Sequence, residues 1–169
     1  GLGRRCKFPL CCGQRRPLSS SACATVACPA AVSGVIGRRT ARVSEAEAPA
    51  HIFGYTCIND VTAVELLKKD ATFDQWSRCK SFDTFGVFGP VIATGLDPAT
   101  LHIRTVLNGQ ERQNYPAADM FFPPAKLVSL ISQDLTFEPG DVICCGTSVG
   151  VGSMKPGSDV AVSIEGVGE

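Results

Sequence analysis

Acidic residues are absent from the first quarter of the sequence: residues 1–44 contain no Asp or Glu, and the first acid is Glu45. The same stretch contains eight of the sixteen basic residues and five of the nine cysteines. Such a composition is typical of a transit peptide or of a disordered basic arm, and it also fits a segment outside the fold, such as an out-of-frame translation. Because the sequence begins with Gly rather than Met, we expect a fragment, which argues against the transit peptide.

Other features are also missing, and each absence argues against a class of protein. No apolar run reaches the roughly 20 residues that span a bilayer, so we expect no transmembrane helix and no membrane partner. The formal net charge is 0, which argues against a nucleic-acid partner, apart from the weak alternative that the basic residues of 1–44 bind one. The nine cysteines form no CxxC pair. This indicates free thiols in a reducing cytoplasm rather than a zinc site or a disulfide framework.

From about residue 32 onward the sequence has the periodicity of a folded domain with short strands. Apolar runs predict strands at Val32–Gly37, Tyr55–Ile58 and Val142–Cys145, and alternation predicts strands at 101–106 and 160–164. Asn108-Gly109 is the strongest short signal for a hairpin turn, so a return strand is expected to begin at 111–113.

Three helices are expected between these strands. Ser44 and Glu47 have the spacing of a capping box, which predicts a helix from Ser44 that ends before Gly54. A second helix is predicted at 62–69. A third begins at Pro123-Pro124, and its expected buried stripe is Leu127, Leu130 and Ile131. Many short strands and few short helices predict a β-dominated α+β fold.

Polar side chains that support chemistry in other proteins occur here too, but each has an ordinary structural explanation. Asp60 has the position of a helix N-cap, and Lys80 is interpreted on its own as a solvated surface lysine. The glycines of 146–152 lack the Lys-Ser/Thr of a phosphate loop. His51 and His102 are interpreted as structural, and no Ser/His/Asp or Cys/His nucleophile pattern stands out. No single motif therefore identifies a function.

Several longer segments carry a resemblance when they are read together and in order. They are Gly54-Tyr-Thr with Asn59-Asp60, Trp76 to Lys80-Ser-Phe-Asp-Thr-Phe85, Asn108-Gly-Gln-Glu-Arg-Gln113, Asp119-Met-Phe-Phe122, Pro139-Gly-Asp-Val-Ile143 with Gly146-Thr147 and Gly150-Val-Gly152, and Ile164-Glu-Gly-Val-Gly168. Over about residues 32–168 the sequence thus resembles the fumarylacetoacetate hydrolase family, in particular its branch of 2-hydroxyhepta-2,4-diene-1,7-dioate isomerases and acylpyruvases. The resemblance implies a rolled β-sheet core with few short helices, usually found in homodimers.

The same resemblance implies an enzyme of aromatic compound catabolism that acts on a small oxo-acid or diketo-acid substrate. The expected reaction is C–C bond hydrolysis, decarboxylation or isomerisation, with Mg²⁺ or Mn²⁺ as cofactor. By resemblance, Asp60 is a metal ligand and Lys80 is the catalytic lysine near the metal. The residues expected to bind substrate are Thr84, Gly146 and Thr147. We expect Asp60 at the mouth of the largest polar pocket, within a few ångströms of Lys80 and Thr147.

The sequence departs from the family pattern near its start. The family completes its metal site with a Glu-x-Glu pair, which aligns here with Pro29 and Ala31, and neither side chain can ligate a metal. The family's substrate-binding Arg and Gln align with Val64 and Leu67, and residues 1–30 supply no His-Glu pair to activate water.

We therefore divide the chain into an atypical segment at 1–31 and a catalytic domain at 32–169. The first is expected to be disordered or out of frame, and the second to be truncated at both ends. Because the metal site is incomplete, the activity of the chain as written is expected to be low. The alternative is an inactive family member that serves as a ligand-binding or subunit-pairing protein.

Overall fold

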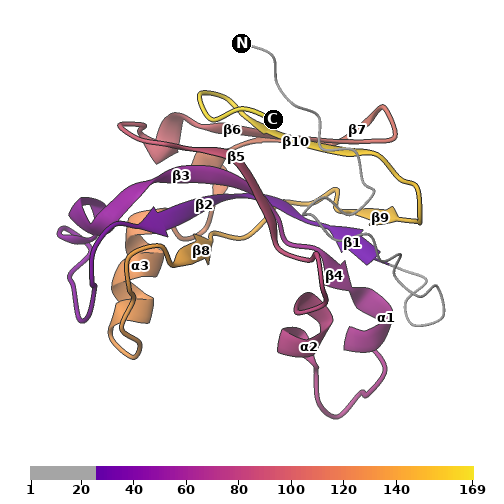
Figure 1. Cartoon of the computed structure of the whole chain (residues 1–169), viewed down its shortest axis with the longest axis horizontal. Helices are drawn as coiled ribbons and strands as arrows, with labels where there is room; N and C mark the ends of the chain where they lie inside the picture. Colours follow the sequence, from indigo (N-terminus) through magenta and orange to yellow (C-terminus); the bar gives the residue numbers. More distant parts are fainter. Residues whose placement is uncertain (1–25) are drawn as a thin grey trace.

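The computed structural model describes residues 26–169, which form three small antiparallel sheets and a few short helices (Figure 1). The strand orders are β4-β1-β9, β10-β6-β7 and β5-β3-β2-β8. The strands are β1 (Val26–Cys28), β2 (Ala30–Ile36), β3 (Ile52–Asn59), β4 (Thr62–Ala63), β5 (Val87–Ala93), β6 (His102–Leu107), β7 (Gln110–Pro116), β8 (Val142–Cys144), β9 (Gly152–Met154) and β10 (Val160–Ile164).

The helices are α1 (Val64–Leu67), α2 (Trp76–Lys80) and α3 (Pro124–Ser132), with 3-10 turns η1 (Ala48–His51), η2 (Pro98–Thr100) and η3 (Ala117–Asp119). This content confirms the predicted β-dominated α+β fold. Across the described residues, no helix has the length and apolar character needed to cross a membrane.

The four-stranded sheet is the centre of the fold, and every residue of its strand β2 is buried. Strands β3 and β8 pair with the two edges of β2. One face of the sheet packs on the β10-β6-β7 sheet, where Val32 and Cys57 join a core with Ile103 and Ile164. Burying each such aliphatic side chain stabilises the fold by about 1.5–3 kcal/mol. This core fixes β2 and β3, which carry the start of the candidate site.

The hairpin turn at Asn108-Gly109 forms as predicted and joins β6 to β7. Both residues have positive φ angles, 50° and 78°, which is the combination that a type I′ turn requires. The resulting register places Gln113 opposite Thr105. Gln113 and Tyr115 consequently face inward and are buried, whereas the residues between and beside them are exposed.

Helix α3 packs on one end of the four-stranded sheet through a different stripe from the one predicted. The buried residues of α3 are Pro124, Val128 and Ser132, which follow one another at four-residue spacing. Of the predicted stripe, Leu127 and Ile131 are half-buried and Leu130 is exposed. The inward face is rotated toward Ser132 because its hydroxyl accepts a hydrogen bond from the Val43 N–H (3.1 Å).

Two predicted helices are shorter than expected. The capping box forms, since Ser44 N–H donates to the Glu47 carboxylate (2.9 Å) and Glu47 N–H donates to Ser44 Oγ (3.3 Å). It closes a turn followed only by η1, because Pro49 lacks an N–H donor and β3 begins at Ile52. The predicted helix at 62–69 is instead β4, which pairs with β1, followed by the single turn α1.

Strand β1 and the first residues of β2 lie inside the segment that was expected to be disordered. β1 pairs with β4 and β9, and Ala30 and Ala31 are buried. Pro29 separates the two strands, as expected of a residue with no N–H to donate to a ladder. The expected lack of regular structure therefore does not extend to residues 26–31, and residues 1–25 lie outside the described part of the chain.

Candidate active site

Asp60 and Lys80 form an ion pair beside the end of β3. Asp60 follows the last residue of β3, and its N–H donates to the Pro29 C=O (2.9 Å). Lys80, the last residue of α2, places its ammonium group on the Asp60 carboxylate and donates to Thr62 Oγ1 (3.0 Å). The ammonium also lies 5.7 Å from the centre of the Trp76 ring, a cation–π distance. Both paired side chains are 31% exposed, so a small ligand can reach them.

The sheet face next to this pair carries a row of small polar side chains. Ser33 of β2 pairs with Cys144 of β8 and with Thr56 of β3, so the three side chains project from the same face. Burial raises the pKa of the Cys144 thiol, and the negative charge of Asp60 also raises it. The interaction with Ser33 and the positive charge of Lys80 lower the same pKa. Thr56 is fully buried and its hydroxyl has no hydrogen-bond partner. The polar face and the ion pair thus form one electrostatic environment.

On the other side of β2, the glycine-rich loop that follows β8 continues alongside Ala30. The pairing of β2 with β8 ends at Ser33, so side chains must satisfy the backbone groups of Ala30 that face this edge. Its N–H donates to Gln113 Oε1 (3.3 Å), and its C=O accepts from the hydroxyls of Tyr115 (2.9 Å) and Thr147 (2.6 Å). The Gln113 amide in turn donates to Thr147 Oγ1 (2.9 Å) and to the Ser148 C=O (2.9 Å). These bonds tie the loop to the start of β2.

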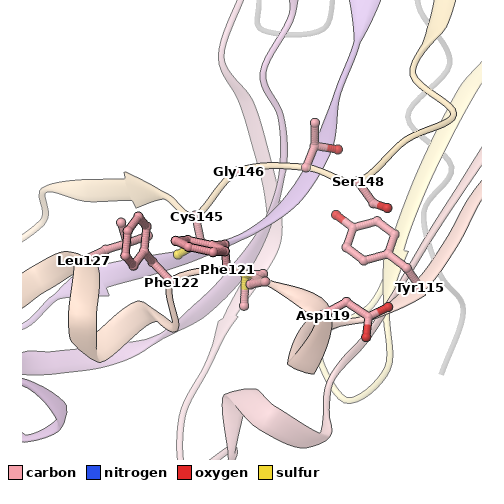
Figure 2. Close-up of a pocket in the computed structure, with 10 residues that line it drawn as sticks. Tyr115, Asp119, Phe121, Phe122, Leu127, Cys145, Gly146 and Ser148 are labelled. Carbon is pink, nitrogen blue, oxygen red and sulfur yellow. The ribbon is translucent and has the colours of Figure 1, made fainter.

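A pocket of about 340 Å³ opens beside this loop (Figure 2). Its lining residues are Tyr115, Asp119, Met120, Phe121, Phe122, Leu127, Cys145, Gly146, Thr147 and Ser148. The rings of Phe121 and Phe122 meet edge to face with centroids 4.7 Å apart, although Phe121 is 89% exposed. The pocket therefore combines an apolar wall with a polar wall of hydroxyls and one carboxylate.

The sequence-predicted site residues gather in two groups on either side of the first residues of β2. Asp60 and Lys80 form one group, and Gly146 and Thr147 belong to the other. Ala30 lies between the two groups, since it pairs with Asn59 on one side and accepts a hydrogen bond from Thr147 on the other. Asp60 does not line the pocket beside the loop, and its closeness to Thr147 stays a prediction.

Thr84 lies in the loop between α2 and β5. Its φ of 73° is in the left-handed region, which a β-branched residue rarely adopts. Its hydroxyl is buried without a hydrogen-bond partner. Strained backbone conformations and unpaired buried groups cluster at functional sites, so Thr84 stays a predicted substrate-binding residue.

Gln113 and Tyr115 are site residues to which sequence reasoning gave no role. A signal was available, since both occupy the inward positions of a strand whose other residues are exposed and, except for Pro116, polar. A buried polar side chain in a strand needs buried partners, and here those partners are Ala30 and the glycine-rich loop.

Comparison with known proteins decides the family. The family model described as fumarylacetoacetate (FAA) hydrolase C-terminal matches residues 18–169. The chain belongs to the fumarylacetoacetate hydrolase family. The solved structure of the 5-carboxymethyl-2-hydroxymuconate delta-isomerase of Mycobacterium smegmatis superposes with a TM-score of 0.83 at 40% identity, covering 88% of this chain and 58% of that one.

Two similar proteins of the fumarylacetoacetate hydrolase family have named activities. The oxaloacetate tautomerase YisK of Bacillus subtilis is 35% identical over 144 residues, covering 79% of this chain and 47% of that protein. The 4-hydroxyphenylacetate degradation bifunctional isomerase/decarboxylase of Salmonella dublin is 38% identical over 137 residues, covering 79% of this chain and 32% of that protein. The chain thus spans about half or less of each of these two relatives.

Fumarylacetoacetate hydrolase family members generally depend on a divalent metal, and the strand register allows a test of that site here. Ala31 pairs with Ile58, and Asp60 bonds to Pro29, so positions 29, 31 and 60 share one sheet face. The positions therefore suit three converging carboxylates, but only Asp60 supplies one, and it is bound to Lys80. Within residues 26–169, no three His, Cys, Asp or Glu side chains gather as metal ligands. The side chains present do not fit the family's metal.

Proposed function

We propose that this chain is the oxo-acid-binding catalytic domain of a fumarylacetoacetate hydrolase family enzyme, with its metal site incomplete. The observation that carries the proposal is the partly exposed Asp60–Lys80 ion pair at the end of β3, on the other side of the start of β2 from the glycine-rich loop. The relatives that support it are named for isomerase, tautomerase and decarboxylase reactions. Such reactions develop negative charge on the oxygen of an enol or enolate, which a positioned ammonium group stabilises.

In this proposal Lys80 binds the carbonyl oxygen of a small oxo-acid or diketo-acid. Asp60 and Thr62 orient the Lys80 ammonium from two sides. Thr84, Gly146 and Thr147 bind the rest of the substrate. A cytoplasmic location and a homodimer are further predictions that accompany this role.

The proposed cofactor of the complete family site is Mg²⁺ or Mn²⁺, and this chain is expected to bind either weakly. A hard cation needs several oxygen ligands, and Asp60 is the single carboxylate at the three aligned positions. Without a metal that stabilises the enolate charge, the transition state loses several kcal/mol of stabilisation. A loss of about 4 kcal/mol slows a reaction roughly a thousandfold, so slow turnover is expected.

An activity assay with one lysine changed tests the proposal. Tautomerisation of oxaloacetate and hydrolysis of an acylpyruvate are measured, with and without Mg²⁺, for the chain, for Lys80→Met and for Lys68→Met. Lys68 is an exposed lysine at the end of α1 and serves as the matched control. We expect slow turnover that falls at least roughly tenfold in Lys80→Met, the effect of losing one charged contact to the transition state, and no change in Lys68→Met. Equal rates in all three proteins would remove Lys80 from the mechanism.

A second candidate function is that of an inactive member that pairs with another subunit. Strand β5 is an edge of the four-stranded sheet, and it exposes Phe88, Val91 and Ile92. Exposed apolar edge strands promote association, which favours pairing with a second copy. Sedimentation of the chain and of Phe88→Glu tests this: a dimer that dissociates in the variant supports it. A monomer in both excludes this pairing.

A further inference from the structure

The side-chain amide of Gln113 is fully used in hydrogen bonding. An amide offers two acceptor lone pairs and two N–H donors. Here Oε1 accepts from the Ala30 N–H (3.3 Å) and the Thr105 hydroxyl (3.0 Å). Nε2 donates to Thr147 Oγ1 (2.9 Å) and the Ser148 C=O (2.9 Å), with the Val149 C=O a third acceptor (3.3 Å). Gln113 is only 3% exposed, so water cannot substitute for these partners.

These bonds fix the direction of a short hydrogen-bond relay. Gln113 cannot flip, because its nitrogen must face the Ser148 carbonyl and its oxygen must face the Ala30 N–H. Thr147 Oγ1 is therefore the acceptor from Gln113, and its own proton goes to the Ala30 C=O (2.6 Å). The second lone pair of that carbonyl is taken by the Tyr115 hydroxyl (2.9 Å). Every donor and acceptor around Ala30 is thus assigned.

The loop approaches β7 closely at a second point, which is independent of the Gln113 amide. A Cβ at Gly150 would lie 2.1 Å from the Arg112 carbonyl oxygen, and Gly150 has a φ of 94°. The loop backbone is therefore pressed against β7 on both sides of Val149. The close approach of Gly150 to β7 therefore restricts the conformations of the loop, and the hydrogen bonds of Gln113 hold it in the one observed.

We infer that Gln113 is a positioning residue that holds the glycine-rich loop against β2 and leaves Thr147 as a hydrogen-bond acceptor toward the ligand. Thr147 is exposed and has one lone pair left after its two assigned bonds. The ligand group that meets it is a donor, such as the O–H of an enol, and not a carboxylate oxygen. The inference rests on the proposed function, and it narrows the ligand to the enol form of an oxo-acid.

The variant Gln113→Glu tests the positioning role through its pH dependence. An ionised Glu has no donor for the Ser148 and Val149 carbonyls, whereas a protonated Glu regains one. Burial raises the pKa of a carboxyl above its ordinary value of about 4.3. The defect is consequently smallest below that ordinary value, where one of the two donors is restored, and complete once the pH exceeds the raised pKa. Gln110→Glu, an exposed change on the same strand, is the matched control.

The measurement is hydrogen exchange of the ligand-free proteins at about pH 8 and about pH 5. At the higher pH we expect the loop amides of 146–150 to exchange at least roughly tenfold faster in Gln113→Glu, because the ionised carboxylate donates none of the hydrogen bonds that the amide makes to the loop. The difference should shrink at the lower pH, and amides of β10 should not change. Equal exchange in all proteins, or loss of protection throughout the fold, would overturn the positioning role.

A ligand pair tests the acceptor role of Thr147. Phenylpyruvate forms an enol, whereas phenylglyoxylate carries the same charge and cannot enolise. By calorimetry we expect tighter binding of phenylpyruvate to the chain and loss of that preference in Gln113→Glu at about pH 8. Equal binding of both ligands would overturn the acceptor role. If neither ligand binds while the loop still loosens selectively, the proposed function fails and the loop-holding role of Gln113 stands.

Discussion

Restoring the two missing carboxylates should make the stability of this fold depend on Mg²⁺. In the double variant Pro29→Glu/Ala31→Glu, both new side chains share a sheet face with Asp60. Ala31 is only 2% exposed, so a Glu there is buried beside another acid. An uncompensated buried charge costs about 3–5 kcal/mol. Without metal we therefore expect the double variant to be less stable than the chain by an amount of this order.

Mg²⁺ should reverse much of that loss, because three carboxylates can share one ion. A ligand that binds only the folded state stabilises it by about 2.7 kcal/mol at a hundred times its dissociation constant. With an ordinary denaturant dependence of about 2 kcal/mol per molar urea, the midpoint of unfolding rises by roughly 1.4 M. The chain as it stands has one carboxylate at these positions, already paired with Lys80, so its midpoint should not move.

The assay is urea unfolding with and without Mg²⁺, followed by calorimetric titration of the metal. Ala46→Glu/Ala71→Glu adds the same charge at two exposed positions and is the matched control. The reasoning is refuted if the unmodified chain binds Mg²⁺ at about micromolar concentration and hydrolyses an acylpyruvate, because other residues must then supply the ligands. A double variant that folds and shows no Mg²⁺ shift would refute the alignment of positions 29 and 31.

Three further predictions concern stability. Gly54→Ala should lower the free energy of unfolding by roughly 1–3 kcal/mol through overpacking, because the new Cβ would lie 2.5 Å from the Ala93 carbonyl oxygen. Gly34→Ala should lower it less, because the nearest atom to its new Cβ is 3.9 Å away, and urea unfolding of the two variants compares the losses. Burial raises the pKa of Cys57 and of Cys145 from 9.0 to about 11. The stability that the two buried neutral thiols contribute is therefore present below about pH 9 and is lost as the pH rises through 11. The urea midpoint of unfolding should fall between about pH 9 and 11, and it should fall less in Cys57→Ala. Asp60→Asn should change the free energy of unfolding by less than about 1 kcal/mol, the ordinary value of a partly exposed pair, and a much larger loss would give Asp60 a structural role.

Features of the fold that depend on a few neighbouring residues could be predicted from the sequence. The Asn108-Gly109 turn requires two positive φ angles, which these residue types tolerate, and it formed. The Ser44–Glu47 capping box also formed, but it did not make a helix, because Pro49 and the start of β3 end the segment. The orientation of α3 could not be read from its own apolar residues, since Ser132 is drawn inward by a backbone group of a distant segment.

The candidate site was predictable as a set of residues but not as an arrangement. The order of motifs indicated Asp60, Lys80 and Thr147, and the structure joins the first two directly. The separation of Thr147 from Asp60 depends on β2 running between them, which is a property of strand order. The role of Gln113 likewise depends on where β8 ends relative to β2. Neither relation is encoded by spacing along the chain.

The two groups of the candidate site are linked through the backbone of β2, even though the metal ligands are missing. Asp60 bonds to the carbonyl of Pro29, and Thr147 bonds to the carbonyl of the next residue, Ala30. A displacement of the glycine-rich loop therefore reaches Asp60 through two adjacent peptide units, which are planar and stiff. Ligand binding by Lys80 and by the loop should consequently be coupled, whether or not a metal is bound. This coupling is why the Gln113 amide, which contacts neither charge, is expected to influence a site on the far side of the strand.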